Sequence, residues 1–102
     1  MNRIKWLKLK SIVKEITEKE VEFVASTHPS EFRAFVVAKG NKIEIYLNME
    51  FAKDVDDVIK SLAHEVAHVL LNDNKHTNKF RDKWNDLTKT ITEKYKEVKN
   101  EN

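Results

Sequence analysis

The five residues from His64 to His68 read His-Glu-Val-Ala-His, and their types and spacing match those of a metal site. Residues four apart lie on the same face of an α-helix, so His64 and His68 can direct two imidazoles at one point. Zinc accepts imidazole nitrogen at about 2.0–2.1 Å. Glu65 lies about 100° around the helix from His64, too far to be a third ligand but close enough to reach a water on the metal. The pattern therefore predicts two zinc ligands and one general base within two helical turns.

The residues around this motif favour a single helix. Asp54, Asp56 and Asp57 offer an N-cap and place negative charge at the positive end of the helix dipole. No glycine or proline occurs from Val55 to Leu71. Apolar residues recur at helical spacing on a wide face, which predicts a central and largely buried helix. These residues are Val55, Ile59, Leu62, Val66, Val69 and Leu70.

A third metal ligand is expected from the residues that follow this helix. A catalytic zinc ion commonly takes three protein ligands and leaves its fourth position to water. Residues 72–75 read Asn-Asp-Asn-Lys and predict a polar turn, and His76 comes directly after it. We therefore expect His76 to be the third ligand. Glu93 is an alternative that requires the last helix to run back across the site, and Asp73 could orient a ligand imidazole through a hydrogen bond.

Length and composition limit the classes of protein to which this chain can belong. Its 102 residues predict one small domain, residues 1–102. The absence of cysteine excludes disulfides, cysteine zinc sites and thiol catalysis. No apolar run approaches the roughly 18 residues of a membrane span, and no signal-peptide core follows the N-terminus, so we expect a cytoplasmic protein.

Charge is distributed unevenly along the chain. The net charge is only +2, but residues 21–74 carry five basic and nine acidic side chains, whereas both flanking segments have a basic excess. This pattern favours folding of the basic ends onto the acidic middle. The near balance of charge disfavours a nucleic-acid-binding protein, although the basic ends leave that class open.

The first third of the chain predicts one helix and one strand. Residues 3–17 are expected to form an amphipathic helix, because apolar residues recur on one stripe among lysines and glutamates. The stripe comprises Ile4, Leu7, Ile12 and Ile16, widened by Trp6 and Leu9. Alternation over residues 21–25 predicts a short strand. Residues 27–30 contain the only proline and predict a loop that carries His28.

Residues 32–38 and 42–48 predict a β-hairpin. Ile43, Ile45 and Leu47 alternate with polar residues, as expected for a half-buried strand. The turn is predicted at residues 39–41, where the only glycine, Gly40, can adopt a positive φ. An exposed edge strand beside a metal cleft could pair with an extended peptide through main-chain hydrogen bonds, although a purely structural sheet is also consistent with the pattern.

The last part of the chain, from Thr77 to about Val98, predicts one long helix capped by Thr77 or Asn78. Its apolar residues form a narrow seam, which permits packing on the core or a homodimer through this helix. The seam comprises Phe80, Trp84, Leu87, Ile91 and Val98, of which the first two are expected near His76. The expected fold class is α+β, with a leading helix, a small three-stranded sheet, the central motif helix and a long C-terminal helix.

Over nearly its whole length, the chain resembles the minigluzincins, small zincin metallopeptidases of thermophilic prokaryotes, on the strength of residues 64–68, the turn and His76. The resemblance implies zinc held by His64, His68 and His76, with Glu65 as the catalytic residue. It also implies latency, with a C-terminal segment of about residues 91–102 blocking the cleft.

Two other groups share parts of this pattern. Residues 63–71 are similar to the motif helix of ImmA/IrrE-type regulatory peptidases, and His76 with Phe80 and Trp84 is similar to SprT-like proteins.

Two functions are expected from these residues. The first is a zinc-dependent endopeptidase acting on a peptide or protein substrate, with His28, Tyr46 and Arg81 as candidates for the oxyanion donor. The second is a catalytically silent zinc-binding module with a regulatory or interaction role.

Overall fold

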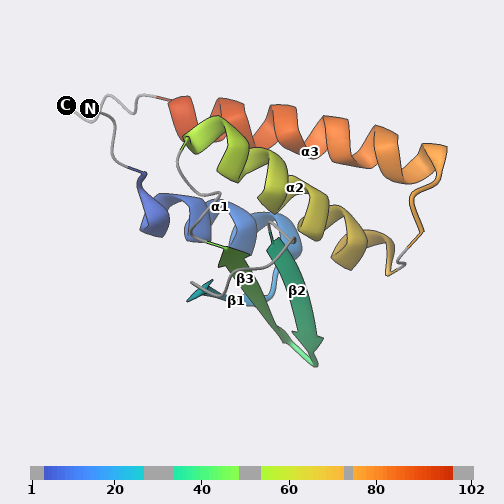
Figure 1. Ribbon diagram of the computed structural model, residues 1–102, viewed down its shortest axis with the longest axis horizontal. Helices are drawn as coiled ribbons and strands as arrows, with labels where there is room; N and C mark the ends of the chain where they lie inside the picture. The colour runs from blue at the N-terminus through green and yellow to red at the C-terminus, as the bar shows by residue number, and fades with distance from the viewer. Residues whose placement is uncertain (1–3, 27–33, 49–53, 73–74, 98–102) are drawn as a thin grey trace.

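Three helices and a three-stranded sheet make up the described part of the chain, which confirms the expected α+β class (Figure 1). The computed structural model describes residues 4–26, 34–48, 54–72 and 75–97. The predicted loop with His28, and also Asp73 and Val98, lie outside these residues. The order is α1 (Trp6–Thr17), β1 (Glu20–Ser26), β2 (Ala34–Lys39), β3 (Lys42–Asn48), α2 (Val55–Leu71) and α3 (Asn78–Lys96).

The sheet has the strand order β1-β3-β2, with β3 at its centre. The predicted hairpin is confirmed, since β2 and β3 pair antiparallel with Ala34 opposite Leu47. Strand β1 runs parallel to β3 with Val21 opposite Ile43, a long-range pairing that the sequence did not indicate. This order leaves β2 as an edge strand.

The hairpin turn consists of two residues, so the predicted three-residue turn at 39–41 was wrong by one residue. Lys39 pairs with Lys42, so the loop is Gly40 and Asn41 alone. Gly40 has a φ of 60°, as the first central residue of a type II′ turn requires. A side chain at this position would be strained, which explains why the only glycine of the chain is here.

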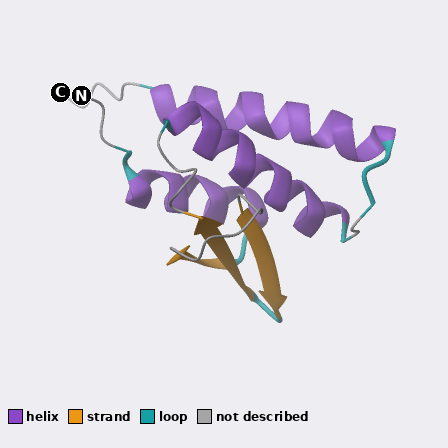
Figure 2. Ribbon diagram, in the orientation of Figure 1, coloured by secondary structure: helices purple, strands orange, loops and turns teal. Residues whose placement is uncertain are grey.

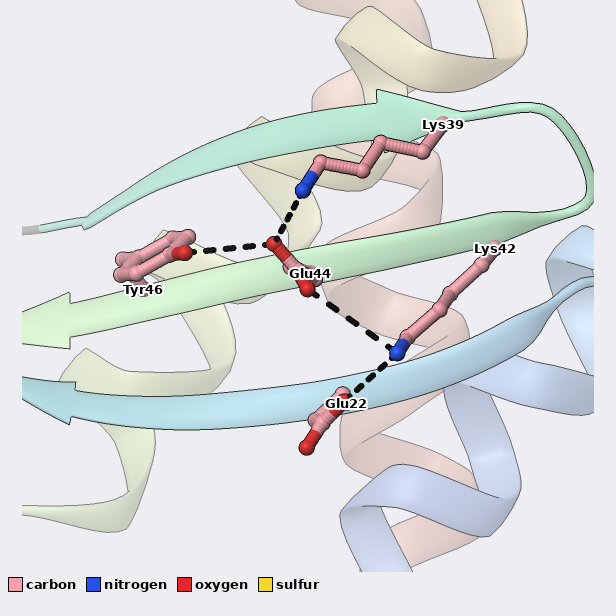
Figure 3. A network of polar contacts seen from close by, with 5 residues as sticks. All are labelled: Glu22, Lys39, Lys42, Glu44 and Tyr46. Atoms are coloured by element: carbon pink, nitrogen blue, oxygen red, sulfur yellow. Dashed lines mark hydrogen bonds and ion pairs between the residues drawn. The ribbon is translucent and has the colours of Figure 1, made fainter.

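The two faces of the sheet differ sharply. One face is apolar and buried against the helices, which lie together on that side of the sheet (Figure 2). On the other face, Lys42 Nζ lies 2.9 Å from Glu22 and 3.9 Å from Glu44, and Lys39 Nζ lies 3.5 Å from Glu44 (Figure 3). The Tyr46 hydroxyl donates to Glu44 Oε1 at 3.2 Å. The Lys42–Glu22 pair is exposed at both side chains, so it stabilises little, but it marks this face as facing solvent.

Helix α1 contacts the sheet and α3 through most of the predicted stripe, since Leu9 and Ile12 are buried and Ile4, Trp6 and Ile16 pack against the core. Leu9 and Val13 are fully buried, whereas Leu7, which the prediction placed on the apolar stripe, is 80% exposed. The prediction was therefore wrong for Leu7 alone, and it left out Val13 and Thr17, which are buried on the same face. The helix ends at Glu18, whose left-handed backbone donates its N–H to the Lys14 carbonyl.

Helix α2 begins and ends as its sequence predicts. The Asp54 side chain accepts from the Asp56 N–H at 3.3 Å, and the left-handed Asn72 closes the last turn. Most of its apolar face is in the core, but Leu70 is 37% exposed, so the prediction was wrong for that residue.

Helix α3 is capped by Thr77, whose hydroxyl accepts from the Phe80 N–H at 3.2 Å. None of the described helices is both long and apolar enough to cross a membrane.

The corrected face of α1 gives a direct test. Leu9→Ala should lower the free energy of unfolding by about 2–5 kcal/mol, because it opens a cavity in the core. Leu7→Ala, the matched change on the same helix, should shift it by less than about 0.5 kcal/mol. Urea denaturation of the metal-free protein followed by circular dichroism measures both; equal losses would show that Leu7 is packed in the core as Leu9 is.

Candidate metal centre

Helix α2 holds His64 and His68 one turn apart, with both side chains half-buried. Their Nε2 atoms are 3.3 Å apart, and the two ring planes are inclined by 79°. Two imidazole nitrogens that bind one tetrahedral ion at about 2.0–2.1 Å would be about 3.3–3.4 Å apart. The separation of this pair therefore fits a shared metal ion.

His76 joins the pair from the segment between α2 and α3. The chain leaves α2 at Asn72, and α3 then packs back along α2, so that His76 lies just before the Thr77 cap. The candidate ligand atoms of the three histidines all lie within 4.8 Å of one another. The ring centroids form a nearly equilateral triangle with sides of 4.8, 5.2 and 5.0 Å. Three imidazoles are thus close enough to bind one metal ion.

The alternative third ligand, Glu93, is not part of this cluster. Its side chain is exposed on α3, about four helical turns after the start of that helix.

A hydrogen bond between His64 and His68 could explain the 3.3 Å separation of that pair. It would not explain the approach of His76 to both rings, which a shared ion would.

Electrostatics keeps His64 in the form that binds metals. Burial, together with the neighbouring His68 and His76, lowers the pKa of His64 to about 4. At neutral pH the ring is therefore uncharged, and one nitrogen offers a free lone pair.

Glu65 lies beside the cluster and is only 9% exposed. Burial raises the pKa of its carboxyl to about 7. A carboxyl group with such a pKa can both take up and release a proton near neutral pH, as a general acid and base must.

One cleft contains both kinds of group. It has a volume of about 510 Å³ and lies between α2, α3 and the first residue of β2. His64 and Glu65 line its wall, so a molecule in this cleft can reach a metal ligand and the buried carboxyl together. The remaining lining residues are Ala34, Asp57, Lys60, Ser61 and Trp84.

Two aromatic residues of α3 hold the imidazoles in place. Phe80 is 1% exposed, and its ring centroid lies 5.0, 4.4 and 4.9 Å from those of His64, His68 and His76. Trp84 contacts His64 edge-on at 4.7 Å, and its Nε1–H donates to the Lys60 carbonyl at 3.0 Å. The sequence predicted both residues near His76, but not that Phe80 touches all three rings. Their spacing of four and eight residues after His76 was the available signal.

Two of the candidates for an oxyanion donor, Tyr46 and Arg81, lie away from this site. Tyr46 donates to Glu44 on the solvent face of the sheet, and Arg81 is exposed on α3. Neither residue lines the cleft that contains Glu65.

Comparisons of this chain with known protein families, with curated proteins and with solved structures found no match.

The cluster predicts one metal ion per chain. With zinc as the probe, His64→Ala, His68→Ala and His76→Ala should each weaken binding by more than about 100-fold, because even the outer partners of metal ligands are worth about 10–100-fold. Glu93→Ala is the matched control and should bind as the wild type does. Elemental analysis and competition with a chelating dye measure this; normal binding by the His76 variant would remove that residue from the site.

The raised pKa of Glu65 predicts a pH-dependent stability difference in the metal-free protein. The unfolded carboxyl ionises near 4.5 and the folded one near 7, so wild-type stability decreases across this range as the buried group becomes charged. Glu65→Gln does not titrate there. Its stability relative to wild type should therefore rise between pH 5 and pH 8, as measured by urea denaturation with a chelator present. A constant difference would show that the carboxyl is not desolvated.

Proposed function

We propose that the protein is a zinc-dependent endopeptidase, in which His64, His68 and His76 hold the ion and Glu65 is the general base. The observation that carries this proposal is the convergence of three imidazoles beside a buried carboxyl. One of these imidazoles, His64, lines the same cleft as Glu65.

The donor set favours zinc among the biological metals. Three imidazoles without a thiolate or a carboxylate suit zinc, and three protein ligands leave one position open, as in catalytic sites. A bound zinc ion supplies a Lewis acid that polarises a carbonyl and lowers the pKa of water to about 7.

Glu65 can act first as the general base and then as the general acid in peptide hydrolysis. Its carboxylate accepts a proton from a water molecule in the cleft as that water attacks the scissile carbonyl. It then gives the proton to the nitrogen of the departing amine. The pKa near 7 in the metal-free protein leaves both forms of the group accessible at neutral pH.

The edge strand β2 supports a peptide as the substrate. Because Lys39 and Lys42 flank a two-residue turn, they form a hydrogen-bonded pair, and such pairs alternate along the hairpin. The intervening residues Ala34, Val36 and Ala38 therefore direct their N–H and C=O groups away from β3. An extended peptide can pair with this edge through its main chain, without requiring particular side chains.

The predicted latency segment, about residues 91–102, is described only up to residue 97. Ile91 is fully buried in the core, and Tyr95 accepts a hydrogen bond from the Lys5 N–H at 3.0 Å. Lys94 Nζ lies 3.5 Å from Glu15. Latency stays a prediction, and a truncation that tests it has to begin after α3, because removal of Ile91 would damage the core.

Glu65→Gln should reduce the cleavage of an unstructured protein by at least about 100-fold, because the variant lacks the proton acceptor. Its zinc content should equal that of the wild type, since the substitution removes no metal ligand. Fluorescence-quenched casein is a suitable substrate, assayed with the full chain and with a chain that ends at Glu97.

Undiminished cleavage by the Glu65→Gln variant would refute the role of Glu65. Full zinc occupancy without cleavage by either wild-type chain would instead favour a silent zinc-binding module.

A further inference from the structure

A second hollow extends the cleft along the same strand and helix. It has a volume of about 840 Å³ and is lined by residues from β2, from the end of α2 and from two neighbouring segments. These residues are Lys19, Val36, Ala38, Gly40, His68, Val69, Asn72 and Lys75. We call it the distal hollow. The cleft meets β2 at Ala34 and α2 at His64, whereas the distal hollow meets them at Ala38 and His68.

The charges of these two hollows differ. The cleft is lined by Asp57, Lys60 and Glu65, which carry both signs. The distal hollow is lined by Lys19 and Lys75 and by no carboxylate of the described residues. The pocket at the Ala38 end of β2 is therefore positively charged.

Lys19 is held in position for an anionic partner. Its Nζ donates to the Gly40 carbonyl at 3.1 Å, which fixes the ammonium group at the turn of the hairpin. A neutral carbonyl leaves the charge uncompensated, and two further donors remain. Among the described residues, no carboxylate pairs with Lys19. The adjacent Glu20 pairs with Lys14 instead, at 3.4 Å.

The direction of a bound peptide follows from the strand. Antiparallel pairing is slightly more stable than parallel pairing, so a peptide on the free edge of β2 should run from Ala38 toward Ala34. Residues on the N-terminal side of the scissile bond then enter the distal hollow. At about 3.3 Å per residue, the length of β2 between these residues corresponds to roughly 13 Å of extended peptide.

We infer that the distal hollow is a subsite for an acidic side chain, about two to four residues before the scissile bond. This inference rests on the proposed peptidase function, and it names the substrate class as extended peptides with Asp or Glu on that side. Lys19 is the specificity-determining residue, and Lys75, which has contacts of its own, also lines the hollow.

Binding to an inactive protein tests this subsite without depending on cleavage. Zinc-loaded full-length Glu65→Gln is titrated with two fluorescein-labelled peptides, identical and uncharged except for Glu or Lys three residues before the central bond. The Glu peptide should bind on the order of tenfold more tightly, because each lysine attracts one peptide and repels the other. The preference should decrease in high salt.

Variants of the lysines make the test specific. Lys19→Glu should abolish or reverse the preference, and Lys75→Gln should reduce it. Lys10→Glu is the matched control, because it makes the same charge change on the exposed face of α1, outside both hollows, and should preserve the preference. If Lys19→Glu does not fold by circular dichroism, Lys19→Gln replaces it and should reduce the preference.

The outcomes separate this inference from the proposed function. Equal affinity for the two peptides, or no binding of either, overturns the acidic subsite. Efficient cleavage of both peptides by the wild type at the same rate also overturns it, while the peptidase function stands. A preference that depends on Lys19, in a protein that cleaves neither peptide, supports the subsite and counts against the peptidase.

Discussion

The packing of α3 against α2 is the constraint on which the candidate site depends. Helix α2 alone can present His64 and His68, but the third imidazole arrives only because α3 runs back along α2 after a short connection. Phe80 fixes this arrangement, since its buried ring contacts all three imidazoles. Phe80 therefore belongs both to the core and to the candidate metal site. A change in the packing of its ring would also change the positions of the three imidazoles.

Burial has opposite effects on the pKa values of the two adjacent functional residues, and both effects suit the proposed chemistry. Loss of water disfavours the charged form of either group. It raises the pKa of Glu65 to about 7 and, together with the neighbouring His68 and His76, lowers the pKa of His64 to about 4. The histidine is then an uncharged ligand at the pH at which the carboxyl exchanges its proton most readily.

Local sequence patterns predicted the features that depend on neighbours in the chain. The caps at Asp54 and Thr77, the central strand β3 and the facing pair on α2 all follow from short-range spacing. Two features that depend on tertiary contacts were missed or wrong. Periodicity showed that α1 is amphipathic, but the neighbours of the helix decide that Leu9 and not Leu7 is buried. The parallel pairing of β1 with β3 likewise depends on contacts across the whole sheet.

The length of the turn at Gly40 determines which main-chain groups of β2 face the open edge of the sheet. A two-residue turn makes Lys39 and Lys42 a hydrogen-bonded pair, and the alternation that follows turns the main chain of Ala34, Val36 and Ala38 toward the open edge. The side chains of these same residues line the cleft and the distal hollow. A turn longer by one residue would shift the register and direct those N–H and C=O groups at β3 instead. The edge that could align a peptide over Glu65 is thus set by a turn at the far end of the strand.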